Sequence, residues 1–444
     1  MRRIVVQRKH SRSGGKVLIG GHRVRINETG NWRAFRHRNF RILFAANTVS
    51  NIGTWAQRIA QDWLVLQLTH SGTYLGLVTA LQFTPVLFLS LHGGALADRF
   101  DKQKVLIGTN IAGGLSAGIL GLLVVTHHVQ LWHVFLLAFL LGVANAVDAP
   151  VRQSFVAEVV GHSDLGNAVS LNSANFNAGR LIGPGVSGAL IAAFGTGPSF
   201  LINGASYFLV IFSLMKLRKS EFYVQSRSRG VANVREGLRY VKARPDLYVV
   251  MIVIFFMATF GMNFQIFNAL IATKVFHRGA MSFGLLGTFV AIGSFSGAII
   301  SARFERFRRT MFVVYGAITF GVSIIILSFM PSYATYAMWL PICGFTALTT
   351  LISANSLMQV NSDPVIRGRV MGIYLLVFLG GAPLGSPLIG WTAEKMGVRP
   401  TLAACGSITI LAALFAFQRY RHKVEVPVDF SIEFVLPPPY DNKS

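Results

Sequence analysis

The sequence predicts an all-α membrane protein with twelve transmembrane helices, arranged as two pseudo-symmetric six-helix bundles. Three observations support this prediction: the composition, a series of long apolar runs and an internal repeat. Hydrophobic residues make up 52% of the 444 residues and charged residues only 13%, against about 25% charged residues in soluble domains. A chain of this composition is suited to lipid and not to water.

Twelve apolar runs have the length of about 20 residues that lets a helix cross a bilayer. The first six fall within residues 42–217 and the last six within 246–418, with a long polar segment between the two sets. The predicted spans cover residues 42–66, 74–97, 104–126, 131–157, 167–193, 198–217, 246–272, 280–302, 311–330, 334–358, 368–392 and 399–418.

Basic residues gather in alternate loops. There are eleven Lys and Arg residues in 1–39, three in 98–104, nine in 216–245, four in 303–309 and two in 361–369, whereas 65–73, 126–132, 193–199 and 329–335 have none. The loops 272–280 and 392–400, with two basic residues each, break the alternation. Because basic loops stay in the cytoplasm, we expect a multi-pass protein of the bacterial cytoplasmic membrane with both termini cytoplasmic.

The net charge of +24 raises the question of nucleic-acid binding. The basic residues flank the predicted spans and do not form one groove, which disfavours a nucleic-acid partner. Topology accounts for the charge.

The apolar and charge patterns divide the chain into five segments. We expect a basic cytoplasmic tail over 1–38, six-helix bundles over 39–217 and 246–418, a cytoplasmic linker over 218–245 and a cytoplasmic tail over 419–444. Residues 1–30 lack the apolar core of a cleavable signal and are predicted to be flexible. The amphipathic stretch 231–240 fits either a helix on the membrane surface or a plain solvated helix.

The two bundles are related by an internal repeat. A shift of 202 residues aligns Gly142 with Gly344, and five further Gly or Pro positions of the fourth to sixth spans align at the same shift. In the first two spans a shift of 208 aligns Gly76 with Gly284. Lipid gives helices no hydrophobic reason to associate, so repeated glycines indicate close backbone approach. Parallel repeats of this kind are typical of transporters.

The loop between the second and third spans reads GALADRFDKQK over residues 94–104. It resembles the G-x-L-A-D-R-x-G-R-[KR]-[KR] signature of the major facilitator superfamily, and it departs from that signature at Asp101 and Gln103. The resemblance implies the superfamily's two-bundle fold and a cytoplasmic gating loop. An Asp at a helix end can accept hydrogen bonds from a neighbouring helix and from basic side chains. The implied gating residues are Gly94, Asp98, Arg99, Lys102 and Lys104.

The fifth span reads GRLIGPGVSG over residues 179–188. It resembles the G-x-x-x-G-P-x-x-G-G antiporter motif of the superfamily's exporters, with Ser187 in place of one Gly. Glycines four residues apart make a flat helix face, and a proline permits a kink. A face of this kind also arises in other transporters. The residues expected to pack helices through this motif are Gly179, Gly183, Pro184 and Gly188.

Four further segments, 53–55, 60–66, 148–153 and 367–372, are similar to the enterobactin-exporter-like branch of the superfamily, which lies beside the multidrug:proton antiporters. The resemblance extends over about residues 38–418. It implies export of a drug or a siderophore-like molecule by alternating access.

Ionisable residues inside a span are costly to bury and are therefore functional candidates. The two pairs Arg58–Asp62 and Asp148–Arg152 are each one helical turn apart, so the members of each pair share a helix face. Arg180 completes the predicted charge network. Depths along the helices predict that Asp148, Arg180 and Arg58 meet at mid-membrane, with Asp62 one turn outward.

Asp62 and Asp148 are the proton-coupling candidates. A carboxyl whose burial and Arg contacts change as the cavity alternates can bind a proton on one side and release it on the other. The alternative for each is a permanent Asp–Arg pair that holds helices together. Arg152 lies near the end of its span and is expected to extend toward the membrane surface.

Polar and aromatic residues complete the predicted cavity. Asn51, Gln57 and Gln265 either face the pore or form buried hydrogen bonds between helices. Trp55, Trp63 and Phe83 either line an apolar substrate cavity or have a role in the interfacial belt or the core, and Trp55 is the cavity candidate retained among them.

The sequence contains no Walker loop, no metal-spaced Cys or His cluster and no nucleophile elbow. We therefore expect neither an enzyme nor a cofactor or metal site. The predicted function is proton-coupled export of an amphipathic small molecule by a monomer in the lipid bilayer, with that molecule and protons as ligands. Two alternatives stay open: a proton-coupled uptake symporter, and a lipid scramblase or other non-transporting membrane protein.

Overall fold

The computed structural model describes residues 16–19, 22–25, 32–223, 234–301, 310–364 and 366–420, and leaves aside the side chains of 16–25, 90–99, 234 and 420. In this part of the chain ten helices are long and apolar enough to cross a membrane. One of them, α4, contains two of the predicted spans, and α1, which has charged residues in its interior, supplies another. Together these helices account for the twelve predicted spans.

The first half consists of α1 (Arg38–Thr69), α2 (Gly72–Arg99), α3 (Lys102–Val125), α4 (Leu131–Phe194) and α5 (Gly197–Met215). At 1.5 Å per residue, the 64 residues of α4 would extend about 96 Å, roughly three times the thickness of a bilayer core. Gly161, with φ 73° and ψ 172°, breaks the helix. Glycine adopts a positive φ at little cost, so the chain can change direction here. The two arms of α4 on either side of Gly161 therefore cross the membrane separately.

The second half follows η3 (Lys219–Glu221) and α6 (Val234–Ala243). Its long helices after the seventh span are α9 (Ala280–Ser301), α10 (Thr310–Ser328), α11 (Tyr333–Val360), α12 (Arg367–Met396) and α13 (Val398–Tyr420). The amphipathic α6 packs on α12, where Glu236 pairs with Arg369 at 2.9 Å. The sequence left open a helix on the membrane surface or a solvated helix for residues 231–240. The contact with α12 belongs to neither expectation.

The seventh span, predicted over 246–272, is present over Pro245–Val275, but it is not one regular α-helix. The structure divides it into α7 (Pro245–Phe256), the π-helical turn η4 (Met257–Gly261), α8 (Phe264–Leu270) and a second π-helical turn η5 (Ile271–Val275). Asn263 holds the break, since its amide donates to the Thr259 carbonyl at 2.8 Å and accepts from the Ser386 hydroxyl at 3.0 Å. Apolar composition is unchanged across a π-bulge, so hydropathy does not register it.

The N-terminal segment contains more order than the flexible tail that the sequence predicts. Strands β1 (Lys16–Ile19) and β2 (His22–Arg25) pair antiparallel, and the short helix η2 (Arg33–Arg36) precedes α1. Neither strand belongs to the helical bundles.

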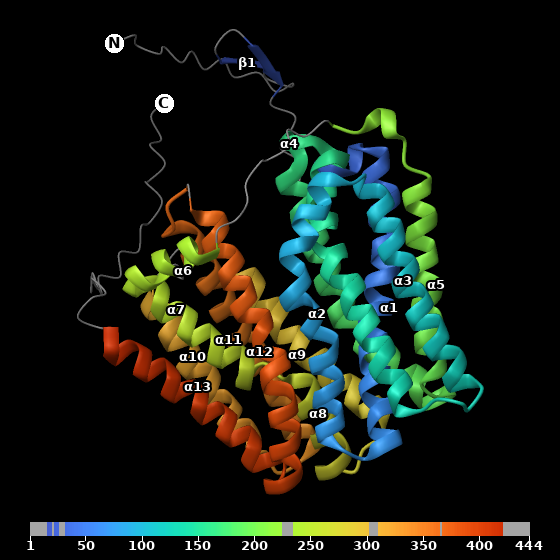
Figure 1. Cartoon of the computed structure of the whole chain (residues 1–444). Coiled ribbons are helices and arrows are strands. Elements are labelled where there is room, and N and C mark those ends of the chain that lie inside the picture. Colours follow the sequence, from blue (N-terminus) through green and yellow to red (C-terminus); the bar gives the residue numbers. More distant parts are fainter. Residues whose placement is uncertain are drawn as a thin grey trace, which may run out of the picture.

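The helices run roughly side by side, so the loops fall at two ends of the molecule (Figure 1). We call the end where α1 begins the basic end, and the end where α1 stops at His70 the far end. The halves meet along two seams, α2 against α12 and α4 against α9. The tightest contacts along both seams lie toward the far end, whereas the two halves diverge toward the basic end (Figure 1).

Two repeated glycines form the seams. A Cβ atom at Gly76 would lie 2.1 Å from the carbonyl oxygen of Ser386, and one at Gly284 would lie 2.3 Å from that of Pro184. No side chain fits at these distances. The sequence repeat aligns these two glycines, and they occupy corresponding places on the two seams. The prediction that repeated glycines permit close helix approach is confirmed at both.

Replacing Gly76 by valine is expected to open the far end. Overpacking costs about 1–3 kcal/mol, which shifts a conformational equilibrium roughly 5- to 150-fold. Labelling of a cysteine at the buried Ala280 by a membrane-impermeant maleimide reports the change. Gly108→Val is the matched control, because no atom lies within 4 Å of its added Cβ. Equal labelling in both variants would contradict the role of Gly76.

Candidate transport site

One face of α1 carries the central polar residues. Asn47, Asn51, Trp55, Arg58 and Asp62 follow one another at intervals of three or four residues, which places them on one side of a helix. The two arms of α4 bring further charges to this face, on either side of the break at Gly161. Packing of α4 against α1 therefore brings the predicted charged residues of the two helices to neighbouring faces.

Asp148 forms a closed ion pair with Arg152. The guanidinium donates from Nε to Oδ2 at 2.7 Å and from Nη2 to Oδ1 at 3.0 Å. Thr109 and Asn110 of α3 also donate to Oδ1, at 2.8 and 3.2 Å, and Arg152 donates from Nη1 to Asn47 at 2.8 Å. The carboxylate is fully occupied, an arrangement that fits a permanent pair between helices.

The expectation that Arg152 extends toward the membrane surface is therefore wrong. Depth in the span suggests that a long side chain can reach water, but Asp148 lies one turn earlier on the same face and captures the guanidinium. The neutral partners of this pair were not predicted. Asn47 carried a signal, because it precedes Asn51 by one turn on the face of the charged residues.

Arg58 and Arg180 lie around the ring of Trp55. Their Cζ atoms are 4.9 and 5.8 Å from its centroid, and Arg58 is also 5.5 Å from the ring of Phe83. Phe176 packs edge-on against Trp55 at 5.6 Å. The predicted meeting of Arg58 with Arg180 is present, but Asp148 does not join them because Arg152 holds it. Among the described residues neither guanidinium has an acidic partner within 4 Å.

Asp62 is buried without a hydrogen bond to its Oδ2 in the described part of the chain. The residue is 5% exposed. Arg58 acts on it electrostatically, although the pairing expected from their spacing is not formed within 4 Å. Asp62 therefore differs from Asp148: one carboxyl is occupied and the other is open.

One of the three amide candidates forms a hydrogen bond between helices. Gln57 accepts a hydrogen bond from Asn203 of α5 at 2.6 Å, and both are buried, so Gln57 joins helices. Asn51 is half-buried beside Gly179, and Gln265 of α8 is half-buried. Trp63 stacks on Phe283 of α9 with ring centroids 6.2 Å apart, which joins the two halves.

The antiporter-like motif packs on two helices at once. Added Cβ atoms at Gly179 and Gly183 would meet α1, at Asn51 and Trp55, at 3.0 and 2.5 Å. Pro184 contacts α9 opposite Gly284, and a Cβ at Gly188 would lie 3.0 Å from the Ala280 carbonyl oxygen. The motif thus serves both the interior of the first half and a seam between halves.

The gating loop is described only in part. The side chains of Gly94, Asp98 and Arg99 lie outside the described residues. Lys102 forms an ion pair with Glu158, and Lys104 donates its backbone N–H to Asp101 at 3.3 Å.

Asp101, a departure from the superfamily signature, caps α3. Its Oδ1 accepts from the backbone of Gln103 at 3.0 Å, and Oδ2 pairs with Lys219 at 2.8 Å. The hydrogen bond from Lys219 is the main cause that lowers the pKa of Asp101, with the backbone bonds adding to it. The side chain performs the capping that a glycine in the signature cannot.

Replacing Asp101 by alanine is expected to lower the free energy of unfolding at neutral pH by about 0.5–2 kcal/mol, the cost of a lost N-cap side chain. Because the folded pKa is depressed, this contribution is present above the ordinary carboxyl pKa and is lost as the pH falls through the folded value. In detergent, the melting temperature of the variant should therefore lie below that of the wild type at pH 7, and the difference should be much smaller in strong acid. A difference that grows in acid would contradict the role of the cap.

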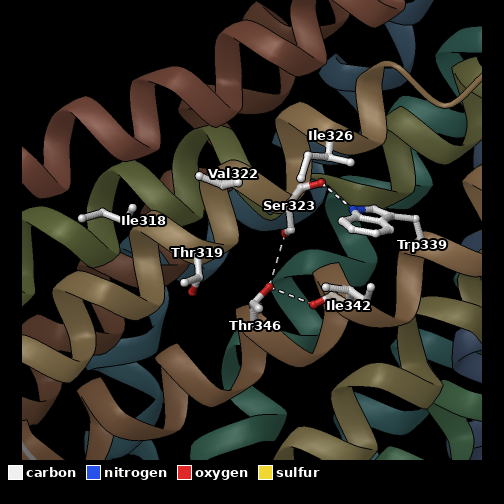
Figure 2. Close-up of a pocket in the computed structure, with 8 residues that line it drawn as sticks. All are labelled: Ile318, Thr319, Val322, Ser323, Ile326, Trp339, Ile342 and Thr346. Atoms are coloured by element: carbon white, nitrogen blue, oxygen red, sulfur yellow. Dashed lines mark hydrogen bonds between the residues drawn. The ribbon is translucent and has the colours of Figure 1, made fainter.

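A hollow of about 240 Å³ between α10 and α11 is a rival location for a ligand (Figure 2). Figure 2 shows its polar groups engaged with one another: Trp339 donates to the Ser323 carbonyl at 2.9 Å, and the Ser323 and Thr346 hydroxyls lie 3.4 Å apart. The other lining groups are mainly aliphatic and none is ionisable. The hollow offers no proton chemistry. Within the described residues, no three His, Cys, Asp or Glu side chains are grouped to hold a metal.

Sequence comparison gives a consistent family. Residues 29–435 match the family described as transmembrane secretion effector. The "Staphyloferrin A transporter" of Staphylococcus aureus is 24% identical over 86% of this chain and 97% of its own length. The "Multidrug efflux pump Tap" of Mycolicibacterium fortuitum is 27% identical over 84% and 94%, and the "Enterobactin exporter EntS" of Citrobacter koseri is 20% identical over 88% and 95%.

Solved structures share the fold. A bacterial homologue of the human lysosomal transporter Spinster, in an inward-facing and unoccupied conformation, has a TM-score of 0.71 at 16% identity and covers 87% of this chain and 97% of its own. The nucleoside transporter NupG has a TM-score of 0.67 at 11% identity, covering 86% and 99%. The chain belongs to the transmembrane secretion effector family of the major facilitator superfamily, and it is a multi-pass membrane transporter.

Proposed function

We propose that this transporter exports an amphipathic small molecule, a drug or a siderophore-like compound, by proton antiport with alternating access. The observation that carries the proposal is the open carboxyl of Asp62, which is buried in the first half without a hydrogen bond to Oδ2. The names of the relatives support export, since one is an exporter and another an efflux pump. The antiporter-like motif over residues 179–188 points the same way.

Asp62 is suited to carry the exchanged proton. A charge buried without hydrogen bonds is costly, so a carboxyl in this position gains by binding a proton. The Arg58 guanidinium one turn away favours release of that proton. Small changes in hydration or in the Arg58 position therefore tip the balance as the halves move. Asp148 lacks this freedom because four hydrogen bonds hold its carboxylate.

The surroundings of Trp55 are suited to an amphipathic substrate. Trp55, Phe83 and Phe176 supply aromatic surface, and two guanidiniums supply N–H donors beside it. A substrate that donates a hydrogen bond to the Asp62 carboxylate binds only while that group is ionised. Proton and substrate then exclude each other, which is the condition for antiport.

We further propose that the basic end is cytoplasmic, that bundles 39–217 and 246–418 rock about the central site, and that the monomer is the working unit. The basic loops favour this orientation. The contacts at Gly76 and Gly284 close the far end, so this conformation corresponds to an inward-facing state.

A second candidate is proton-coupled uptake of an anionic solute. It is favoured by Arg58 and Arg180, which share Trp55 and have no acidic partner within 4 Å in the part of the chain that the structure describes. An anion bound there would displace Asp62 from the field of Arg58 and favour protonation, so anion and proton would bind together.

The direction of coupled flux decides between the two. Purified protein in proteoliposomes that contain a pH-sensitive dye is supplied with a panel of drugs and siderophores. Antiport predicts that substrate leaving a vesicle makes its lumen more acidic, because protons enter in exchange. Substrate and protons that move in the same direction identify the symporter. Substrate-independent proton flux together with lipid exchange would support neither.

A further inference from the structure

A pocket of about 430 Å³ opens between the two halves at the far end. It lies between the last turns of α1 and the segment that follows α8, which are the corresponding ends of the first spans of the two halves. At the shift of 208 residues that aligns Gly76 with Gly284, Leu66 corresponds to Lys274, and both line the pocket. His70 and His277 also share a left-handed backbone, with φ of 52° and 50°.

Corresponding segments that meet each other lie beside the axis that relates the two halves, and in this superfamily that axis runs along the membrane normal. The pocket is therefore on the line along which a substrate crosses. Leu66 lies one helical turn beyond Asp62, a rise of about 6 Å. Trp63, stacked on Phe283 of the other half, is part of the lining and closes the way inward.

The pocket is rich in unengaged donors. The side chains of Gln67, His70, Lys274 and His277 form no hydrogen bond or ion pair with another residue in the described ranges, and all four are exposed to the pocket or its mouth. Thr273, by contrast, donates to the Ala269 carbonyl at 2.7 Å. Lys274 brings a full positive charge and the imidazoles bring N–H groups.

The far-end turns around the pocket are positive. They contain Lys274, Arg278, Lys395 and Arg399 against the single acid Glu394, in turns that the structure describes throughout. The Glu394 carboxylate is engaged by the backbone and hydroxyl of Thr73, at 3.1 and 2.5 Å. Arg278 and Arg399 lie over the rings of Tyr333 and Phe276. Lys274 is therefore the positive charge that lines the pocket and is available to a ligand.

We propose that this axial pocket binds a small organic anion, a carboxylate- or phosphate-bearing solute whose apolar part rests on Trp63 and Leu66. The volume is in the range of small-molecule sites, and Lys274 with the two imidazoles recognises the anionic group. The proposal rests on the proposed function in one respect: on a transport axis, this pocket is the site where an exported anion halts before release.

Equilibrium binding of phthalate, an aromatic dicarboxylate, tests the proposal. The full chain is placed in nanodiscs of phosphatidylcholine, without any proton gradient, and titrated by calorimetry. Lys274→Gln is expected to weaken phthalate binding about tenfold or more, the loss of one charge-assisted hydrogen bond. The double variant H70N/H277N is expected to weaken it as well, and asparagine tolerates the left-handed backbone at both positions.

Lys395→Gln is the matched control, because it removes an exposed charge from the same end but outside the pocket. Its affinity should stay within about twofold of the wild type, the scatter expected for a screened surface charge. Thermal melting verifies the folding of each variant. If Lys274→Gln does not melt near the wild type, Lys274→Arg is measured in its place and should keep the affinity.

Three results would overturn the proposal: equal binding of neutral phthalamide, unchanged affinity in Lys274→Gln, and phthalate binding abolished by phosphatidylglycerol in the nanodisc, which would assign the pocket to a lipid headgroup. Failure here is separable from failure of the proposed function. Phthalate binding requires no proton gradient, and it is measured alongside pH-driven transport by the same preparation.

Discussion

Replacing Asp62 by asparagine is expected to abolish pH-driven transport while leaving the protein folded. Asparagine keeps the size of the side chain but cannot exchange a proton, so an imposed pH difference should no longer drive transport. The remaining flux should equal the substrate counterflow that is measured without a gradient. Folding should survive because the amide breaks no hydrogen bond of Oδ2, which has no hydrogen-bond partner in the described part of the chain. The measurement is substrate flux in proteoliposomes with and without an imposed pH difference.

Two further variants sharpen the Asp62 experiment. Asp62→Glu retains a carboxyl and is expected to keep part of the coupling. Glu221→Gln removes an exposed carboxylate paired with Arg218 at 3.3 Å and is expected to transport like the wild type. Full pH-driven flux through Asp62→Asn would remove Asp62 from the proton path and, with Asp148 already held by four hydrogen bonds, would leave the antiport proposal without a carrier.

The fold was largely predictable because lipid imposes a simple rule on the sequence. A span needs about 20 apolar residues, and the observed helices end within a few residues of the predicted limits. Close helix approach at the repeated glycines was predictable as well, since only a small residue allows the contact of Gly76 with Ser386. Which helices these contacts join was not. The break at Asn263 was not, because it depends on one amide that reaches a neighbouring helix.

The site was less predictable than the fold. Spacing along a helix predicts which residues share a face, but it does not predict which partner a long side chain selects. Arg152 and Arg58 each have an aspartate one turn away. Arg152 pairs with Asp148, whereas Arg58 turns to the rings of Trp55 and Phe83. That choice depends on residues supplied by other helices.

The unequal halves suggest how the transport cycle is organised. The charged residues of the described membrane interior, Arg58, Asp62, Asp148, Arg152 and Arg180, all belong to the first half. The second half contributes seams and a seventh span with two π-helical turns. In such a cycle, the charged half would stay rigid and bind ligands, and the apolar half would move against it. The costly charge network would then be confined to one body. Movement then need not break the Asp148–Arg152 pair.

Removing Arg152 is therefore expected to destabilise the protein more than any other single change in the network. Arg152→Gln leaves the Asp148 carboxylate with only the donors from Thr109 and Asn110. Removing one partner of a fully buried pair costs about 3–5 kcal/mol, because the remaining charge is left uncompensated. The side chains of Arg152 and Asp148 are 28% and 18% exposed, so water screens part of that charge and the loss is expected to lie below this range. Thermal melting and urea unfolding of the detergent-solubilised protein measure the loss.

The double variant D148N/R152Q separates a structural pair from a proton carrier. With both charges gone, neither is left uncompensated, so much of the stability lost in Arg152→Gln should return. The double variant should also retain pH-driven flux, because Asp62 is intact. A double variant as unstable as the single one would mean that Arg152 acts through Asn47. A stable double variant without pH-driven flux would return Asp148 to the proton path.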